Sequence, residues 1–352
     1  MIDMFRRLLR SLLPVAVLFS VSARGDDDDY KLGQGYNWGS YNFAGYSDIV
    51  EYLPTQHGES QTVGNFSAFV SGHVSSYFNP FIEIWISGDG VARANTDISR
   101  PGVDPSLSPQ RIYDDIEMSD SLTLRVGNML TPVGTWNQLP VPALALTTAR
   151  PAVTDLNFSN YLAGMSVNYS DVNGHLPDLQ VYWQPVGDFN AQSSGGVLNA
   201  YQTTHYKMVE GLHASIPLSL LDYVGVSFQR SRNALDTDQS LYGLDFKYTF
   251  DALTLQGEFT YSDLSGNLEG VPRHQETGIY LAASYELSER WALTSWVEEY
   301  RGRDASSAAR DLLWGAVYRP LPAMAFKLEY LQNIGGPPVN PTGLLGSWSV
   351  LF

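Results

Sequence analysis

The sequence contains no cysteine, which excludes a disulfide framework, a thiolate metal site and a thiol nucleophile. Basic residues are also scarce, since 21 Lys and Arg against 37 Asp and Glu give a formal net charge of −16. Because phosphate binding needs a basic surface, we expect no nucleic acid partner. Beyond the first 23 residues, no apolar run approaches the ~18 residues of a helical membrane span, so we expect no transmembrane helix.

Alternation of apolar and polar residues is the main pattern in the middle of the chain. Residues 242–250 alternate Tyr, Leu, Phe, Tyr and Phe with polar or small residues, and residues 253–262 repeat this pattern after a two-residue link. The spacing predicts two strands joined in a hairpin. The polar side carries Asp245, Lys247 and Glu258, which a dry sandwich core would not accept unpaired but a water-filled lumen would.

The same alternation recurs along the chain and predicts about sixteen strands, an even number as in single-chain bacterial barrels. We therefore expect an all-β fold, a transmembrane antiparallel up-and-down β-barrel, against the alternative of a secreted all-β protein with an ordinary buried last strand. The expected strands begin near Tyr41, Phe66, Phe81, Gln110, Leu122, Asn160, Asp178, Lys207, Tyr223, Leu241, Leu253, Glu276, Trp291, Asp311, Met324 and Thr342.

The first residues have the layout of a secretory signal peptide. Arg6, Arg7 and Arg10 precede an apolar stretch at 12–21, and small residues end the segment at Ala23. We expect a signal peptide at 1–23, a mature N-terminal segment at 24–40 and a barrel at 41–352, with a membrane anchor as the competing interpretation. Three Arg and one Asp lie before residue 24, so the mature chain carries a charge of about −18.

The last residues alternate as well, because Leu344, Gly346, Trp348, Val350 and Phe352 share one face of an expected strand. This ending resembles the carboxy-terminal assembly signal of bacterial outer-membrane β-barrels. The resemblance implies that Trp348, Val350 and Phe352 act in assembly. It also implies an outer-membrane location, with outer-membrane lipid and the barrel assembly machinery as partners.

The links between strands alternate in length. We expect the short links to be periplasmic turns, near residues 119–121, 219–222, 251–252, 288–290 and 320–323. The longer, Gly-, Pro-, Ser- and Asn-rich links should be extracellular loops, at residues 88–109, 188–206, 231–240, 263–273, 302–309 and 333–341.

The link at residues 131–157 is too apolar for a solvated loop and too rich in proline for a central strand. The preceding segment, residues 125–134 (RVGNMLTPVG), resembles a strand-end segment of the phosphate-selective porin group, and the overall layout resembles general, trimeric bacterial porins. The resemblance implies that residues 131–157 fold into the barrel as a constriction loop, and it allows a homotrimer. The alternative is a loop that only covers the rim. A phosphate pore needs a ladder of basic residues, but only Arg150 and Arg125 are available here.

Inward positions and the loop together supply the candidate pore residues. The loop carries one Arg and one Asp, whereas acidic residues prevail over the whole chain, which favours a weak preference for cations. The expected pore-lining or constriction residues are Arg125, Arg150, Trp136, Asp155, Glu83, Asp245, Lys247, Glu258, Lys327 and Glu329.

Signals of catalysis are weak, because the six His residues are dispersed and no nucleotide-binding or hydrolase motif occurs. We expect no enzyme, no metal and no cofactor. The sequence favours a porin for the passive diffusion of small hydrophilic solutes or ions. The alternatives are an occluded structural or adhesive barrel and, third, a hydrolase with its site at the rim.

Overall fold

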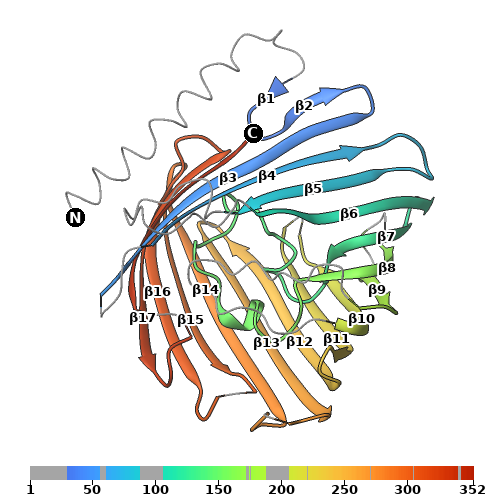
Figure 1. The fold of residues 1–352 in the computed structure, drawn as a ribbon. Helices are drawn as coiled ribbons and strands as arrows, with labels where there is room; N and C mark the ends of the chain where they lie inside the picture. Colours follow the sequence, from blue (N-terminus) through green and yellow to red (C-terminus); the bar gives the residue numbers. More distant parts are fainter. Residues whose placement is uncertain are drawn as a thin grey trace.

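The computed structural model describes residues 30–55, 61–87, 106–171, 174, 176–187, 206–219, 221–269, 271–303, 305–339 and 342–352. In these residues sixteen strands, β3 to β18, form one closed antiparallel barrel, which confirms the expected fold and strand number. Figure 1 shows the strands as a ring around the lumen. Within the described ranges, no helix is long and apolar enough to cross a membrane. The predicted signal peptide, residues 1–23, lies outside the described residues.

The strand bounds follow the predicted alternation closely. The first half of the barrel consists of β3 (Tyr41–Pro54), β4 (Gln61–Gly72), β5 (Pro80–Ser87), β6 (Ser106–Ser119), β7 (Leu122–Leu130), β8 (Tyr161–Tyr169), β9 (Asp178–Gln184) and β10 (Tyr206–Pro217). The second half consists of β11 (Tyr223–Asn233), β12 (Thr237–Phe250), β13 (Leu253–Gly266), β14 (Gln275–Ser288), β15 (Trp291–Arg301), β16 (Ala309–Tyr318), β17 (Met324–Gly335) and β18 (Gly343–Leu351).

Three strands begin four or five residues earlier than predicted: β4 at Gln61, β6 at Ser106 and β12 at Thr237. Apolar residues are sparse at these ends, with Val63 in β4, Leu107 in β6 and none at residues 237–240, so the alternation on which the prediction depended is weak there. The expected loop at residues 231–240 is consequently wrong in length, and only three residues separate β11 from β12. Asn233 Oδ1 accepts the backbone N–H groups of Leu235 and Thr237, which closes this tight turn. The expected loop at 263–273 is also shorter, because β13 continues to Gly266.

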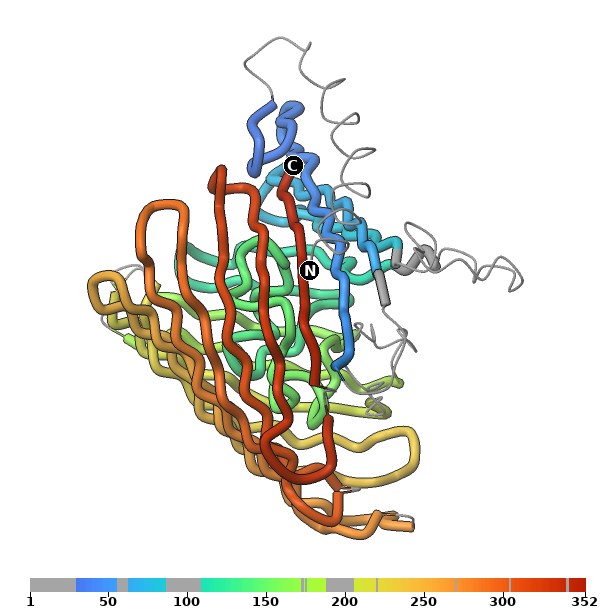
Figure 2. Tube along the Cα trace, turned by 90° about the vertical axis from the view of Figure 1, so that its left-hand side faces the viewer, coloured from blue at the N-terminus to red at the C-terminus, as the bar shows by residue number. Residues whose placement is uncertain are grey.

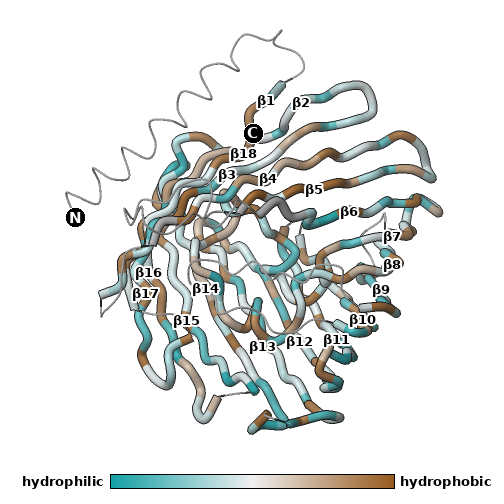
Figure 3. The backbone as a smooth tube through the Cα atoms, in the orientation of Figure 1, coloured by the Kyte–Doolittle hydropathy of each residue, from teal (hydrophilic) through white to brown (hydrophobic). Residues whose placement is uncertain are grey.

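Alternation sorts the side chains between two faces, and Figure 3 shows hydrophobic and hydrophilic residues mixed along the strands. In β12, Tyr242 and Leu244 are about half exposed on the outer face, while Asp245 on the other face is 2% exposed. Outward apolar residues suit lipid, and inward polar residues suit a lumen.

The barrel closes where β18 pairs with β3, from Gly343 opposite Pro54 to Leu351 opposite Tyr46. Figure 2 shows β18, in red, beside β3, in blue. Two short strands, β1 (Tyr30–Lys31) and β2 (Gly35–Trp38), precede the barrel, and β2 pairs with the first residues of β3.

The closure has a specific contact at Phe352. Its backbone N–H and carbonyl exchange hydrogen bonds with Gly45, at 2.9 and 2.8 Å, and its ring stacks on Phe66 with the centroids 5.4 Å apart. A side chain at position 45 would collide with this ring, so the absence of a Cβ at Gly45 permits the contact. Trp348 and Val350 pack with Ile49 in the neighbouring strand.

Candidate functional site: the inward loop and the open lumen

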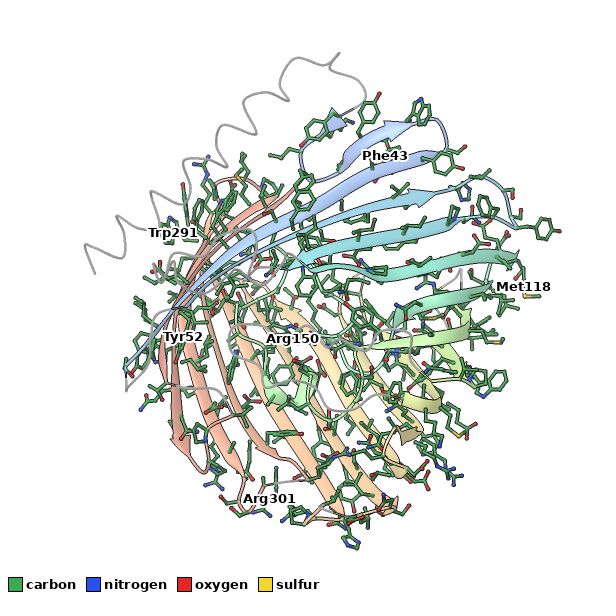
Figure 4. The ribbon with its side chains drawn as sticks, viewed as in Figure 1. Phe43, Tyr52, Met118, Arg150, Trp291 and Arg301 are labelled. Atoms are coloured by element: carbon green, nitrogen blue, oxygen red, sulfur yellow. The ribbon has the colours of Figure 1, made fainter. Side chains whose placement is uncertain are left out.

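Residues 131–160 connect β7 to β8 and fold into the barrel. Their short 3-10 helix η2 (Ala152–Thr154) contacts β13, β14 and β15, on the opposite wall. Figure 4 places Arg150 of this loop inside the ring of strands, well away from the rim residue Met118. The predicted insertion of residues 131–157 is therefore confirmed, and the alternative of a loop that covers only the rim is wrong.

Three inward carboxylates on three strands hold the loop by its backbone. Glu258 in β13 accepts the N–H groups of Thr135 and Trp136, at 3.0 and 2.8 Å. Glu298 in β15 accepts the N–H of Ala152 at 2.6 Å.

The third carboxylate, Glu329 in β17, accepts the N–H of Thr148 at 2.8 Å. A proline-rich loop leaves N–H groups without a ladder partner, and ionised acceptors form the stronger type of hydrogen bond with such groups.

A buried lysine holds the middle of the same loop. Lys327 Nζ in β17 donates to the carbonyl oxygens of Pro142 and Ala145, both at 2.8 Å. The hydroxyls of Thr148 and Ser347 are hydrogen-bonded at 2.7 Å. Near the end of the loop, Gln239 in β12 donates to the carbonyl oxygen of Asn157 at 2.7 Å, and Tyr206 in β10 accepts the N–H of Ser159 at 3.0 Å.

An apolar cluster inside the barrel supports these polar anchors. The loop side chains Trp136, Ala149, Ala152 and Val153 pack against inward residues of β14 to β18. The wall side contains Tyr280, Trp296, Leu313, Leu331 and Leu345, each at most 2% exposed. This side of the lumen is therefore a packed core, without open water.

Sequence reasoning missed this cluster, because the barrel pattern assigns polar residues to inward positions. One signal was available: Trp296, Leu313 and Leu331 occupy the inward phase of their strands, where water-facing residues are expected. An apolar inward patch needs an apolar partner, and the loop at 131–157 is the apolar segment available to cover it.

The first part of the loop also joins a network of polar contacts with inward residues of the barrel wall. Thr135 Oγ1 lies 3.4 Å from Asp245 Oδ2, and the Tyr223 hydroxyl donates to Thr135 Oγ1 at 2.6 Å. His213 Nε2 lies 3.3 Å from Asp245 Oδ1.

The wall opposite the packed core carries arginines that are paired with carboxylates. Arg111 Nε lies 2.5 Å from Glu83 Oε2, and Arg125 makes a bidentate contact with Asp115 at 2.7 and 2.8 Å. Arg125 also lies over the ring of Tyr113, 4.0 Å from its centroid. Within each pair the positive and the negative charge neutralise each other.

The described residues line two adjoining cavities in the lumen. The smaller, of about 170 Å³, lies between the loop and β3 to β7 and includes Arg150 and Lys327 in its lining. The larger, of about 610 Å³, lies along β7 to β12 and includes Arg125 and Lys247. Leu139 of the loop lines both cavities, so they adjoin at this residue. Because Arg125 and Arg150 line different cavities, they do not meet at one constriction.

The predicted site residues are thus brought into one region with different contacts. Trp136, Arg150 and Asp155 belong to the loop. Glu258, Lys327 and Glu329 form hydrogen bonds with the loop, and Asp245 lies next to it. Glu83, Arg125 and Lys247 lie on the barrel wall. Their part in permeation stays a prediction. Across the described residues, no group of His, Asp and Glu has the arrangement of a metal site.

Comparison with known proteins agrees with this architecture. A family model described as Gram-negative porin matches residues 160–305. Salmonella typhi OmpF in complex with daunomycin is a similar solved structure, with 11% identity, a TM-score of 0.63, and coverage of 89% of this chain and 97% of that one.

An anion-selective porin from Comamonas acidovorans has 13% identity and a TM-score of 0.60, over 89% of this chain and 99% of that chain. A loop-deletion mutant of OmpT from Vibrio cholerae has 9% identity and a TM-score of 0.62, with the same coverage. At these identities the likeness establishes the fold. No curated protein matches the sequence. The Gram-negative porin model matches residues 160–305, and the closed barrel with its inward loop has the fold of the outer-membrane porins to which the chain is similar.

Proposed function

We propose that small hydrophilic solutes and ions diffuse passively through the part of the lumen that the loop leaves open. The observation that carries this proposal is the pair of adjoining cavities on the β3 to β12 side, with Leu139 between them. The packed cluster fills the other side, so the route is narrow and its position is fixed by the loop anchors.

The charges along this route favour weak ion selectivity. Four acidic residues on the lumen side are engaged, because Glu258 and Glu329 accept loop N–H groups while Glu83 and Asp115 pair with arginines. A paired charge contributes little field at a distance, especially beyond the ~8 Å over which physiological salt screens it. The contacts therefore support a channel closer to neutral selectivity than the total charge of −16 suggests.

The alternatives receive less support. The Gram-negative porin match favours a non-enzymatic channel over a hydrolase at the rim or an occluded adhesive barrel. We extend the proposal to a homotrimer, since one similar structure, OmpT of Vibrio cholerae, is described in a trimer form. We also propose contact with outer-membrane lipid through the exposed apolar face, and folding by the barrel assembly machinery.

Swelling of proteoliposomes tests the proposal. Purified folded protein should admit small sugars and amino acids and should admit larger saccharides progressively more slowly, because the route is limited by the loop. Vesicles that hold the folded barrel and admit no small solute would favour the occluded barrel.

A further inference from the structure

Two residues that line the smaller cavity each carry a buried hydrogen-bond acceptor that lacks a partner. Asp48 and Asn160 both line it, and they are 4% and 6% exposed. In each side chain Oδ1 has no hydrogen-bond partner among the described residues. The other atoms are occupied, since Asn65 donates to Asp48 Oδ2 at 3.1 Å and Asn160 Nδ2 donates to Asp155 Oδ1 at 2.5 Å. Buried acceptors without donors are costly, so this cavity suits a ligand that supplies O–H or N–H groups.

The same cavity presents apolar and aromatic surface. Trp85 of β5 and Tyr161 of β8 are partly buried in its lining, and Leu139 and Pro140 come from the loop. The face of an aromatic ring carries negative charge density, which attracts weakly positive C–H groups. A ligand for this surface needs an apolar C–H face in addition to its hydrogen-bond donors.

The fixed charges disfavour ions as ligands. Arg150 and Lys327 line the cavity and repel cations, while Asp48 lies on the same lining and repels anions. Each charge already has a counterpart, because Arg150 Nη1 lies 3.9 Å from Asp155 Oδ1, and Lys327 interacts electrostatically with Asp48 and Glu329. A neutral ligand enters without disturbing these pairs and without losing the hydration of a net charge.

We propose that this cavity is a binding subsite for a neutral, polyhydroxylated ring, that is, a monosaccharide unit. Hydroxyl groups supply donors to Asp48 and Asn160, and the C–H face of the sugar ring packs on Trp85. The cavity of about 170 Å³ is below the usual size of drug-binding pockets and suits one ring. This inference rests on the proposed channel, because the sugar reaches the subsite through the lumen.

Sugar-dependent block of the ion current tests the subsite. Single channels are recorded with glucose, glucosamine and glucuronate, which share one ring but are neutral, cationic and anionic. Glucose should reduce the current with a saturable concentration dependence and a lower half-blocking concentration than either charged analogue. Trp85→Ala and Asp48→Ala should each raise the half-blocking concentration of glucose by about tenfold. The matched control Trp183→Ala, at an outward position that is 44% exposed, should leave it unchanged.

The outcomes separate the subsite from the channel. If glucose lowers the ion current only in proportion to the viscosity of the solution, and equally in all variants, the subsite is overturned and the channel is left intact. Stronger block by glucosamine or glucuronate would show that the cavity selects for charge, which also overturns the proposal. A folded barrel without any current would refute the proposed function, and the subsite with it. If Asp48→Ala does not fold, Trp85→Ala decides.

Discussion

Removing the carboxylate of Glu258 should destabilise the first turn of the inward loop. In Glu258→Ala, three donors lose their acceptor: the N–H groups of Thr135 and Trp136, and the Tyr280 hydroxyl, which lies 3.0 Å from Glu258 Oε1. At about 1 kcal/mol or more for each buried donor, the attached state loses about 3 kcal/mol. That loss corresponds to a change of about 100-fold in the ratio between the state in which the turn at residues 134–139 is detached from the wall and the state in which it is attached.

Burial of Trp136 opposes the release. Its side chain is 5% exposed in the loop cluster, and at ~25 cal/mol per Å² the burial of a ring of ~200 Å² is worth about 5 kcal/mol as an upper estimate. The apolar term is larger than the polar loss, so the attached turn should remain the major state in Glu258→Ala. We therefore expect brief openings to larger conductance, about 100-fold more frequent than in the unaltered protein.

Single-channel recording of three variants checks this reasoning. Glu258→Ala combined with Trp136→Ala should make the larger conductance the main state, because both contributions are then lost. Glu258→Gln retains one acceptor oxygen and should lie between the unaltered protein and Glu258→Ala. The control Glu289→Ala, at an exposed turn position, should behave as the unaltered protein. If the double variant folds and its conductance and noise do not change, the turn at residues 134–139 does not limit the current.

Three further predictions concern assembly, the lumen and a turn. Deleting Phe352 removes two backbone hydrogen bonds and a ring stack at the closure, so the heat-modifiable folded form should fall several-fold; normal levels would contradict its role. Asn168→Cys, in the larger cavity, should react with a water-soluble thiol reagent, whereas outward Val167→Cys should not; equal labelling would argue against a lumen on this side. The Ser219 hydroxyl donates a hydrogen bond to the Asp222 carboxylate and lowers its pKa. The ionised carboxylate therefore stabilises the folded protein above the ordinary aspartate pKa, and this stabilisation is lost as the pH falls through the lowered value. Asp222→Asn should remove this acid dependence of unfolding, and an unchanged pH profile would refute the role of Asp222.

Much of the barrel could be predicted from the sequence, because a strand with one face toward lipid and one toward the lumen has a period of two. The segment around Tyr242 to Phe259 shows this directly, because the predicted hairpin forms and Asp245 pairs with Glu258 across it. The strands β4 and β12 were predicted too short at their starts, near Gln61 and Thr237, since apolar residues are sparse there.

The contacts of the lumen were harder to predict. The charged inward residues appeared to need water, but Glu258 and Glu329 are buried under the loop instead. Likewise, the inward Trp296 and Leu331 have a purpose only once the loop is known to cover them. These contacts join residues more than 100 positions apart, so no local pattern records them.

The ion current through the purified, folded protein in a planar lipid bilayer tests the central claim most directly. The proposed route past Leu139 predicts discrete conductance steps that are stable in time, with a reversal potential near zero in a KCl gradient because charges along the route are paired. A barrel that is folded and inserted but carries no current would contradict the claim that the loop leaves the lumen open.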